Sequence, residues 1–257
     1  MSLDFTLKKY EEFCSFLKDK SCPVMTLEEF FRAGQPSEFS VILRHDIDRG
    51  LKSALRLAKL ESSYNINSTY YVRMTKSVYQ PLKIKHLIEL GHEVGYHYET
   101  LTKARGDQLK AIDIFANELE MLRQICSINT ISMHGSPLTP WNNMDLWKDY
   151  DFSRFNILAD AMLSIDYSKL YYFTDTGGSW NAGKHNIRDK TDSLSDSLSI
   201  ETTDDLMDLI NDGIKHPIII NTHPNRWAKG LSSYLLIKIF DYMINRVKLV
   251  VCRAKSA

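Results

Sequence analysis

The sequence predicts an α/β protein with a parallel sheet in a single domain, residues 1–257, and three observations support this. Short apolar segments rich in β-branched residues alternate with amphipathic segments of helical length, which is the order of strands joined by crossover helices. The composition, 44% apolar and 25% charged, is that of a globular domain and excludes collagen-like, disordered and disulfide-scaffold classes. The length suits one α/β barrel, and no repeat or linker marks a domain boundary.

The expected elements follow in order from the spacing of the apolar residues. Phe5, Tyr10 and Leu17 recur at helical spacing among charged residues, which predicts a surface helix at the start. Residues 39–43 form a short β-branched run typical of a buried strand. The same reasoning predicts strands at 69–72, 93–97, 130–133, 170–173 and 217–220, and helices at 52–60, 82–90, 107–125, 203–211 and 227–247. Residues 137–202 are otherwise irregular, so we expect loops there.

Charge and hydropathy narrow the function classes. The 32 Lys and Arg residues equal the 32 Asp and Glu residues, so the chain lacks the positive surplus that nucleic acid or an anionic membrane would require. No segment approaches the roughly 18 consecutive apolar residues of a membrane span, and the first residues do not form a secretory signal. We therefore expect a cytoplasmic protein that binds neither nucleic acid nor membrane.

Polar residues follow five of the expected strands, where ligands bind in parallel α/β folds. These segments are Arg44-His45-Asp46-Ile47-Asp48, His97-Tyr98-Glu99, His134-Gly135, Thr174-Asp175 and Asn221-Thr222-His223. Asp and His from separate strands converge only if the sheet is a barrel or tightly curved, and such a cluster suits a divalent metal beside a titrating pair. The alternative, at any one position, is that Asp caps the next helix and His is a satisfied core residue.

Four segments resemble the polysaccharide deacetylase family in order and spacing. They are Arg44-His45-Asp46-Ile47-Asp48, Ser68-Thr69-Tyr70-Tyr71-Val72, Gly91-His92-Glu93-Val94-Gly95-Tyr96-His97, and the apolar strand ending at His223-Pro224. The resemblance covers about residues 40–225. It implies a distorted, incomplete (β/α) barrel, here with an added N-terminal helix, and the removal of acetyl groups from N-acetylated sugars by a metal-activated water.

The resemblance also implies roles for individual residues. Asp46 matches the general base, and Asp48 matches a metal ligand across a one-residue insertion, Ile47. His97 matches a second metal ligand and His223 the general acid. Asp175 matches loosely an acidic residue of the fourth family motif, which adds it to the expected catalytic set.

Two departures from the family pattern stand out. A second ligand His normally follows four residues after the first, where this chain has Leu101. The third ligand must come from elsewhere, and we expect His134 rather than Glu99 or His92. The family Arg that orients the base is missing at the third motif, where the chain has Met133-His134-Gly135. The chain therefore resembles a divergent branch whose substrate can differ from the usual one.

The expected function is a metal-dependent hydrolase that removes an N-acyl group, most simply N-acetyl, from a sugar, sugar nucleotide or lipid-linked glycan precursor. The His/His/Asp set favours Zn²⁺, although Co, Ni or Fe suits the same ligands. Trp141, Trp180 and Trp227 could stack on a sugar ring, and Arg226 could bind an anionic group. The alternatives are a hydrolase of a formamide or cyclic imide, and an inactive glycan-binding or assembly protein. The oligomeric state stays open, with a homo-oligomer among the choices.

Overall fold

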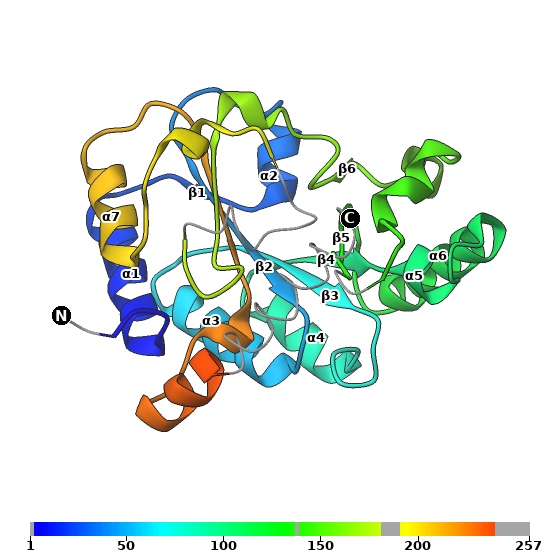
Figure 1. Ribbon diagram of the computed structural model, residues 1–257, viewed down its shortest axis with the longest axis horizontal. Coiled ribbons are helices and arrows are strands. Elements are labelled where there is room, and N and C mark those ends of the chain that lie inside the picture. The colour runs from blue at the N-terminus through cyan, green and yellow to red at the C-terminus, as the bar shows by residue number, and fades with distance from the viewer. Residues whose placement is uncertain (1–2, 137–138, 181–190, 240–257) are drawn as a thin grey trace, which may run out of the picture.

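The computed structural model describes residues 3–136, 139–180 and 191–239, and its strands form one parallel sheet (Figure 1). The strands are β1 Val24–Met25, β2 Val41–Ile47, β3 Thr69–Arg73, β4 Glu93–Tyr98, β5 Thr130–Met133, β6 Ala159–Asp160, β7 Tyr171–Thr174 and β8 Ile218–Thr222. Their spatial order is β6-β5-β4-β3-β2-β8-β7, with β1 paired to the start of β2. This is the strand order of a barrel in which, among the described strands, β6 and β7 do not pair. The expected incomplete (β/α) barrel is confirmed.

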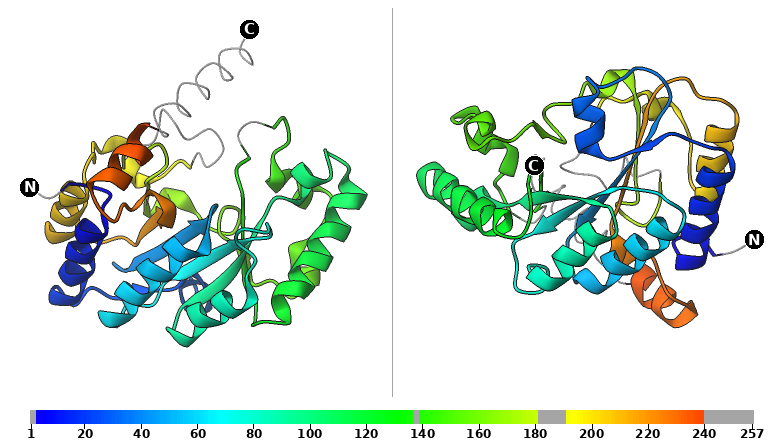
Figure 2. Two further views of the ribbon diagram at one scale, coloured as in Figure 1. Left: turned by 90° about the horizontal axis from the view of Figure 1, so that it is seen from below. Right: turned by 180° about the vertical axis from the view of Figure 1, so that it is seen from behind.

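Helices cover the outer face of the sheet (Figure 2), apart from one short helix whose Leu27 and Phe30 pack with Ile42 on the inner face. They are α1 Leu7–Asp19, α2 Leu27–Arg32, α3 Leu51–Ser63, α4 Pro81–Glu89, α5 Thr100–Lys103, α6 Gln108–Arg123 and α7 Thr203–Asn211, followed by a helix over residues 231–239. One apolar cluster joins α3, α4 and α6 to β3, β4 and β5, and a second joins α1 and α7 to β2 and β8. None of the helices in the described ranges is both long and apolar enough to cross a membrane.

Strand β2 has one face toward the interior of the barrel and the other toward the helices that pack outside it. Ile42 packs in an inner apolar cluster, whereas Val41 and Leu43 pack against the outer helices. Side chains alternate along a strand, so Arg44 and Asp46 share the inner face with Ile42. The residue between them is directed to the opposite side. The sequence of β2 thus assigns alternate polar residues to two different environments.

Several element boundaries differ from the expected ones. The strand expected at 39–43 continues to Ile47, because the charged side chains of Arg44 and Asp46 are paired and can be buried within it. The sequence pattern did not predict α2, although Thr26 and Glu29 form a capping box at its start. The two-residue strands β1 and β6 were not predicted either, because each is too short to show periodicity.

The last helix begins later than expected. Residues 224–226 form a 3₁₀ turn and Ala228 bridges to Thr6, so the helix expected from Trp227 starts only after Gly230. Its expected continuation from 240 to 247 lies outside the described residues. The remaining expected strands and helices are observed, with ends that differ by a few residues.

Candidate active site and metal centre

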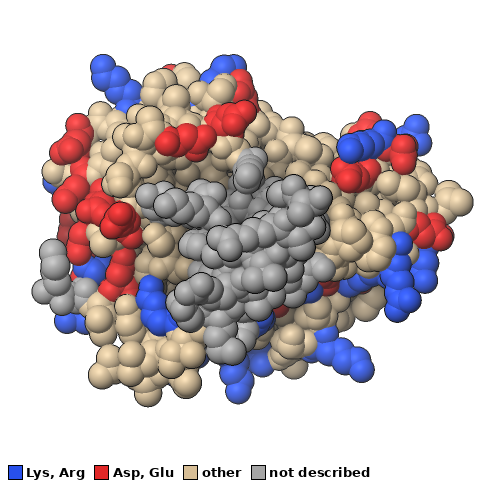
Figure 3. Space-filling model, in the orientation of Figure 1, with Lys and Arg blue, Asp and Glu red and all other residues tan. Residues whose placement is uncertain are grey.

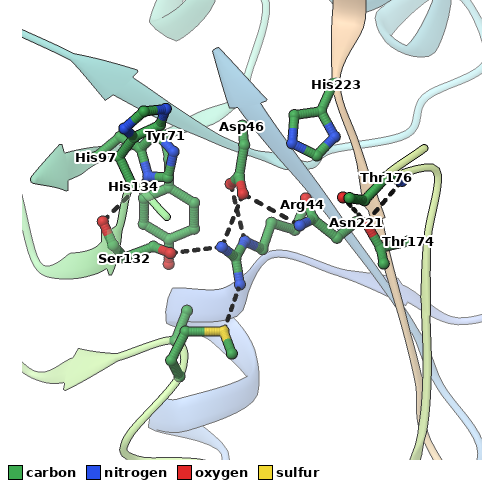
Figure 4. Close-up of polar contacts among 12 residues, drawn as sticks. Arg44, Asp46, Tyr71, His97, Ser132, His134, Thr174, Thr176, Asn221 and His223 are labelled. Atoms are coloured by element: carbon green, nitrogen blue, oxygen red, sulfur yellow. Dashed lines mark hydrogen bonds and ion pairs between the residues drawn. The ribbon is translucent and has the colours of Figure 1, made fainter. Parts of the chain in front are cut away.

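Five polar side chains converge at the carboxyl edge of four strands of the sheet. Asp46 and Asp48 come from the end of β2, and His97, His134 and His223 come from β4, the end of β5 and the end of β8. Figure 4 shows Asp46 between the imidazoles of His97 and His134 on one side and His223 on the other. Residues spread over 177 positions of the sequence therefore form one cluster, as parallel strands with neighbouring ends require.

Asp48 lies at the centre of the imidazoles. Its Oδ1 is 3.5 Å from His97 Nε2 and 3.5 Å from His134 Nε2, and its Oδ2 is 3.9 Å from His223 Nε2. Asp48 Oδ1 is buried and has no hydrogen-bond partner among the described residues. A buried carboxylate oxygen without a partner is costly, so this atom suits a bound cation.

The spacing of the donors supports the same conclusion. Two ligands held at about 2.0–2.2 Å by one tetrahedral Zn²⁺ lie roughly 3.4 Å apart. The separations of 3.5 Å from Asp48 Oδ1 to His97 and His134 agree with that value. Among the described residues, no group of three or more His, Cys, Asp and Glu side chains is already arranged to hold a metal ion. The fit of a cation therefore rests on Asp48 Oδ1, a buried oxygen without a hydrogen bond that lies 3.5 Å from each of two imidazole nitrogens.

The hydrogen bonds of the two imidazoles fix which nitrogen faces Asp48. His97 Nδ1 is 3.1 Å from the Ser132 carbonyl oxygen, and His134 Nδ1 is 2.9 Å from Ser136 Oγ and 3.2 Å from Glu99 Oε2. The carbonyl and the carboxylate only accept hydrogen bonds and the Ser136 hydroxyl can accept one, so these contacts all fit a proton on Nδ1 in both rings. Each Nε2 then presents a lone pair toward Asp48, the arrangement found in metal-binding histidines.

Asp46 is held rigidly inside the barrel. Arg44 Nε donates to Asp46 Oδ1 and Arg44 Nη2 donates to Asp46 Oδ2, both at 2.9 Å, and Asn221 Nδ2 donates to Oδ2 at 3.1 Å. Arg44 Nη2 also donates to Ser132 Oγ at 2.5 Å, and its guanidinium lies 5.2 Å from the centre of the Tyr71 ring. Burial alone would raise the pKa of Asp46, but Arg44 lowers it to about 2. Asp46 is therefore ionised and oriented.

His223 is paired with Asp175. His223 Nδ1 is 2.6 Å from Asp175 Oδ1, and Asp175 also accepts from the His223 backbone N–H and from Trp227 Nε1. Burial alone would lower the pKa of His223, but the Asp175 carboxylate raises it to about 9. Near neutral pH this imidazole carries a proton that it can donate from Nε2.

The two other residues considered as third ligand lie elsewhere. His92 is buried at the start of β4, where its Nε2 is 2.9 Å from the Ala58 carbonyl oxygen and its Nδ1 is 3.1 Å from Ser68 Oγ. Glu99 lies on the Nδ1 side of His134, away from the nitrogen that faces Asp48. The structure brings His134 to Asp48 and leaves His92 and Glu99 outside the donor set.

Two of the tryptophans expected to contact substrate are core residues. Trp180 and Trp227 are 4% and 2% exposed, and both rings pack against Phe5. A sugar cannot reach these ring faces, which corrects the expectation for both. Trp141 is half-buried and packs against Gly106, and Arg226 Nε lies 3.9 Å from Asp175 Oδ1.

The sequence analysis assigned no role to three residues that hold Asp46. Arg44, Ser132 and Asn221 form its polar surroundings. Arg44 could have been found, because a residue two positions before Asp46 on a strand shares its face. Arg44 on β2 makes the contact with Asp46 that the sequence led us to expect from an Arg in the third motif. No sequence pattern pointed to Ser132 or Asn221.

Comparisons with known proteins give structures but no sequence match. No protein-family model and no curated protein matches the chain. Similar solved structures include the deacetylase PplD of Streptococcus pyogenes in complex with acetate, which is 14% identical over 64% of this chain and 71% of that one, with a TM-score of 0.44. Another is a CE4 family pseudoenzyme from Bacillus anthracis, 14% identical over 81% of this chain and 60% of that one, with a TM-score of 0.44.

A third similar structure is the peptidoglycan deacetylase PdaC of Bacillus subtilis. It is 14% identical over 86% of this chain and 95% of that one, with a TM-score of 0.42. The matches thus include deacetylases and a pseudoenzyme of the CE4 family, and the chain spans only three fifths of the pseudoenzyme's length. With these identities and TM-scores, function has to be inferred from the side chains of this protein.

Proposed function

We propose that the protein is a metal-dependent hydrolase that removes an N-acyl group, most simply N-acetyl, from a sugar-containing substrate. The observation that carries the proposal is Asp48 Oδ1, a buried carboxylate oxygen without a hydrogen bond that lies 3.5 Å from each of two imidazole nitrogens. The tautomers of His97 and His134 direct lone pairs to the same point. Two imidazoles and one carboxylate leave coordination positions open, as a catalytic site requires.

Asp48, His97 and His134 are the residues that would hold the cation. Two imidazoles with a carboxylate favour Zn²⁺, and Co, Ni or Fe suits the same donors. When bound, the cation would polarise the amide carbonyl and lower the pKa of a water molecule. Every other step falls to the protein's own side chains.

Asp46 is the proposed general base and His223 the proposed general acid. Asp46 Oδ1 accepts one hydrogen bond, from Arg44, and so retains a lone pair for a proton from the attacking water. His223, with a pKa of about 9, is protonated near neutral pH and can donate to the leaving amine nitrogen. Asp175 keeps that imidazole charged and oriented. The Arg44 contact makes Asp46 a weak base, so proton removal depends on the acidity of the water.

The proposed substrate is an N-acylated sugar compound such as a sugar nucleotide or a lipid-linked glycan precursor. An inactive binding protein is less well supported, because its two arguments were the missing ligand His and the missing orienting Arg. His134 Nε2 lies 3.5 Å from Asp48 Oδ1, which supports it as the third ligand, and Arg44 contacts the proposed base directly. A formamide or cyclic imide hydrolase would use the same residues and differs only in its substrate.

The test combines metal content with product release. Wild-type protein should contain one divalent ion per chain by mass spectrometry and should release acetate from N-acetylated sugar nucleotides. Asp48→Ala should lose both properties, while Asp151→Ala, which changes an exposed carboxylate at the start of a 3₁₀ turn, should keep both. The proposal would be refuted if wild-type protein contained no metal and if, in added zinc, Asp48→Ala had the same metal content and acetate release as wild type. Formate or an opened imide in place of acetate would select the other amide substrates.

A further inference from the structure

Glu99 lies directly behind one of the proposed metal ligands. Glu99 Oε2 is 3.2 Å from His134 Nδ1, whereas His134 Nε2 faces Asp48 Oδ1 at 3.5 Å on the other side of the ring. Glu99 is 4% exposed, so water competes little for this contact. The backbone of His134 is fixed as well, since its N–H donates to the Tyr98 carbonyl and its own carbonyl accepts from Asn143 Nδ2, each at 2.7 Å.

Two cations hold Glu99 in turn. Arg73, the last residue of β3, donates from Nε to Glu99 Oε1 at 2.9 Å and from Nη2 to Glu99 Oε2 at 2.5 Å. Lys103 Nζ lies 3.7 Å from Oε1. Both carboxylate oxygens are thus engaged, and the side chain cannot turn to Asp48 without breaking a bidentate ion pair.

The two proposed imidazole ligands therefore have unequal partners. His97 Nδ1 faces a neutral backbone carbonyl, while His134 Nδ1 lies 3.2 Å from the Glu99 carboxylate in addition to its 2.9 Å contact with Ser136 Oγ. A carboxylate at Nδ1 makes the opposite nitrogen a better donor to a metal, and it also holds the ring in one orientation. His134 is therefore held and activated more strongly by its Nδ1 partners than His97 is.

We propose that Glu99 is a positioning residue for His134 and that it sets the affinity of the site for a divalent cation. This inference rests on the proposed function, because it takes His134 as a metal ligand. Arg73 holds the carboxylate against Nδ1, and Glu99 keeps Nε2 unprotonated and directed to Asp48.

The test compares two isosteric charge removals in one network. Glu99→Gln removes the carboxylate at His134, whereas Glu118→Gln removes a carboxylate that contacts Lys103 Nζ at 2.7 Å and Tyr96. The dissociation constant for Zn²⁺ is measured by competition with a chromophoric chelator, and the absorption spectrum of bound Co²⁺ reports the ligand geometry. Glu99→Gln should bind Zn²⁺ about 10- to 100-fold more weakly and shift the Co²⁺ bands. Glu118→Gln should leave both unchanged.

Each other outcome has a defined meaning. Unchanged affinity and spectrum in Glu99→Gln, or equal losses in both variants, would overturn the inference while leaving the proposed function intact. Wild-type protein that binds no Zn²⁺ would overturn both. Glu99→Asp keeps the charge but withdraws it from Nδ1, so we expect an intermediate affinity. If Glu99→Gln fails to fold, wild-type affinity in Glu99→Asp refutes the inference.

Discussion

Two polar clusters lie on opposite faces of strand β2, and they differ in one respect. On the inner face, Asp48 Oδ1 has no hydrogen-bond partner among the described residues. On the outer face, His45 Nε2 contacts Glu61 Oε1 at 2.7 Å, and Glu61 Oε2 accepts from Ser68 Oγ and Tyr70 Oη at 2.7 Å each. We call this second group, with Tyr10 and His92, the Glu61 network.

The difference separates stability from function. Both oxygens of Glu61 accept hydrogen bonds, and His45 Nδ1 is 2.6 Å from Thr222 Oγ1, so this network is complete without a ligand. A satisfied buried network fixes one arrangement of the strands and helices that contribute to it. The inner cluster leaves Asp48 Oδ1 without a partner among the described residues, as the proposed cation site requires. Substitutions on the inner face should therefore affect turnover, and those on the outer face should affect folding.

The largest effect is expected on the inner face. Asp46→Asn keeps the size of the side chain but removes the charge that accepts the proton, so the turnover number for acyl release should fall about 10²- to 10⁴-fold. Metal content, measured on the same sample, should stay at the wild-type level, because Asp46 lies outside the proposed ligand set. Wild-type turnover in Asp46→Asn would exclude this residue as the base. It would also contradict the assignment of turnover to the inner face of β2.

The matching change on the outer face should act on stability. Glu61→Ala leaves His45 without its anionic partner and creates a buried hole, so the free energy of unfolding should fall by about 3–5 kcal/mol. Denaturant unfolding measures this loss, and Glu61→Gln, which keeps the volume, should lose less. The Zn²⁺ dissociation constant of folded Glu61→Ala should equal that of wild type. A changed dissociation constant would show that the two faces are coupled through β2.

A third change probes the inner face from a neighbouring strand. A Cβ at Gly95 would collide with the Tyr71 ring, which lies against Arg44, so Gly95→Ala should lower the free energy of unfolding by about 1–3 kcal/mol and reduce turnover. Gly230→Ala is the matched control, because a Cβ there meets open space. Reduced stability with full turnover would show that Arg44 holds Asp46 independently of Tyr71.

The smallest effect concerns pH. Burial alone would raise the pKa of Glu61, but His45 lowers it from 4.5 to about 2. A depressed folded-state pKa contributes stability above the unfolded value and loses it as pH falls toward the folded value. The stability difference between wild type and Glu61→Gln should therefore shrink between about pH 4.5 and 2. Urea midpoints at several pH values measure it, and a constant difference would mean that Glu61 is not ionised in the folded protein.

The residues of the inner cluster could be predicted from the sequence better than the residues that surround them. Strand ends and spacing brought Asp46, Asp48, His97 and His223 together, because parallel strands present their carboxyl ends at one edge. The partner of Asp46 was missed, and so was Glu61 in α3, since nothing local distinguishes a buried acid from an exposed one on an amphipathic helix.

The tryptophans also show that local sequence does not tell which side chains are buried. Trp180 and Trp227 follow strand-end motifs, yet both pack in the core. Whether an aromatic ring covers the core or faces a ligand depends on which helices pack over it, and here Phe5, beside the start of α1, covers both. Figure 3 shows charged residues of both signs around the rim of the visible face, with several acidic side chains grouped along its left edge.

The pairing of β8 with β2 has a consequence for how the protein is made. Thr222 meets His45 across 177 residues of sequence, so this contact forms only after nearly all of the barrel has been synthesised. Closing so long a loop is slow and late in folding. Because β8 delivers Asn221 and precedes His223, a nascent chain can carry the proposed metal ligands before it carries the proposed proton donor. Hydrolytic competence would then arrive in one step, when the last strand docks.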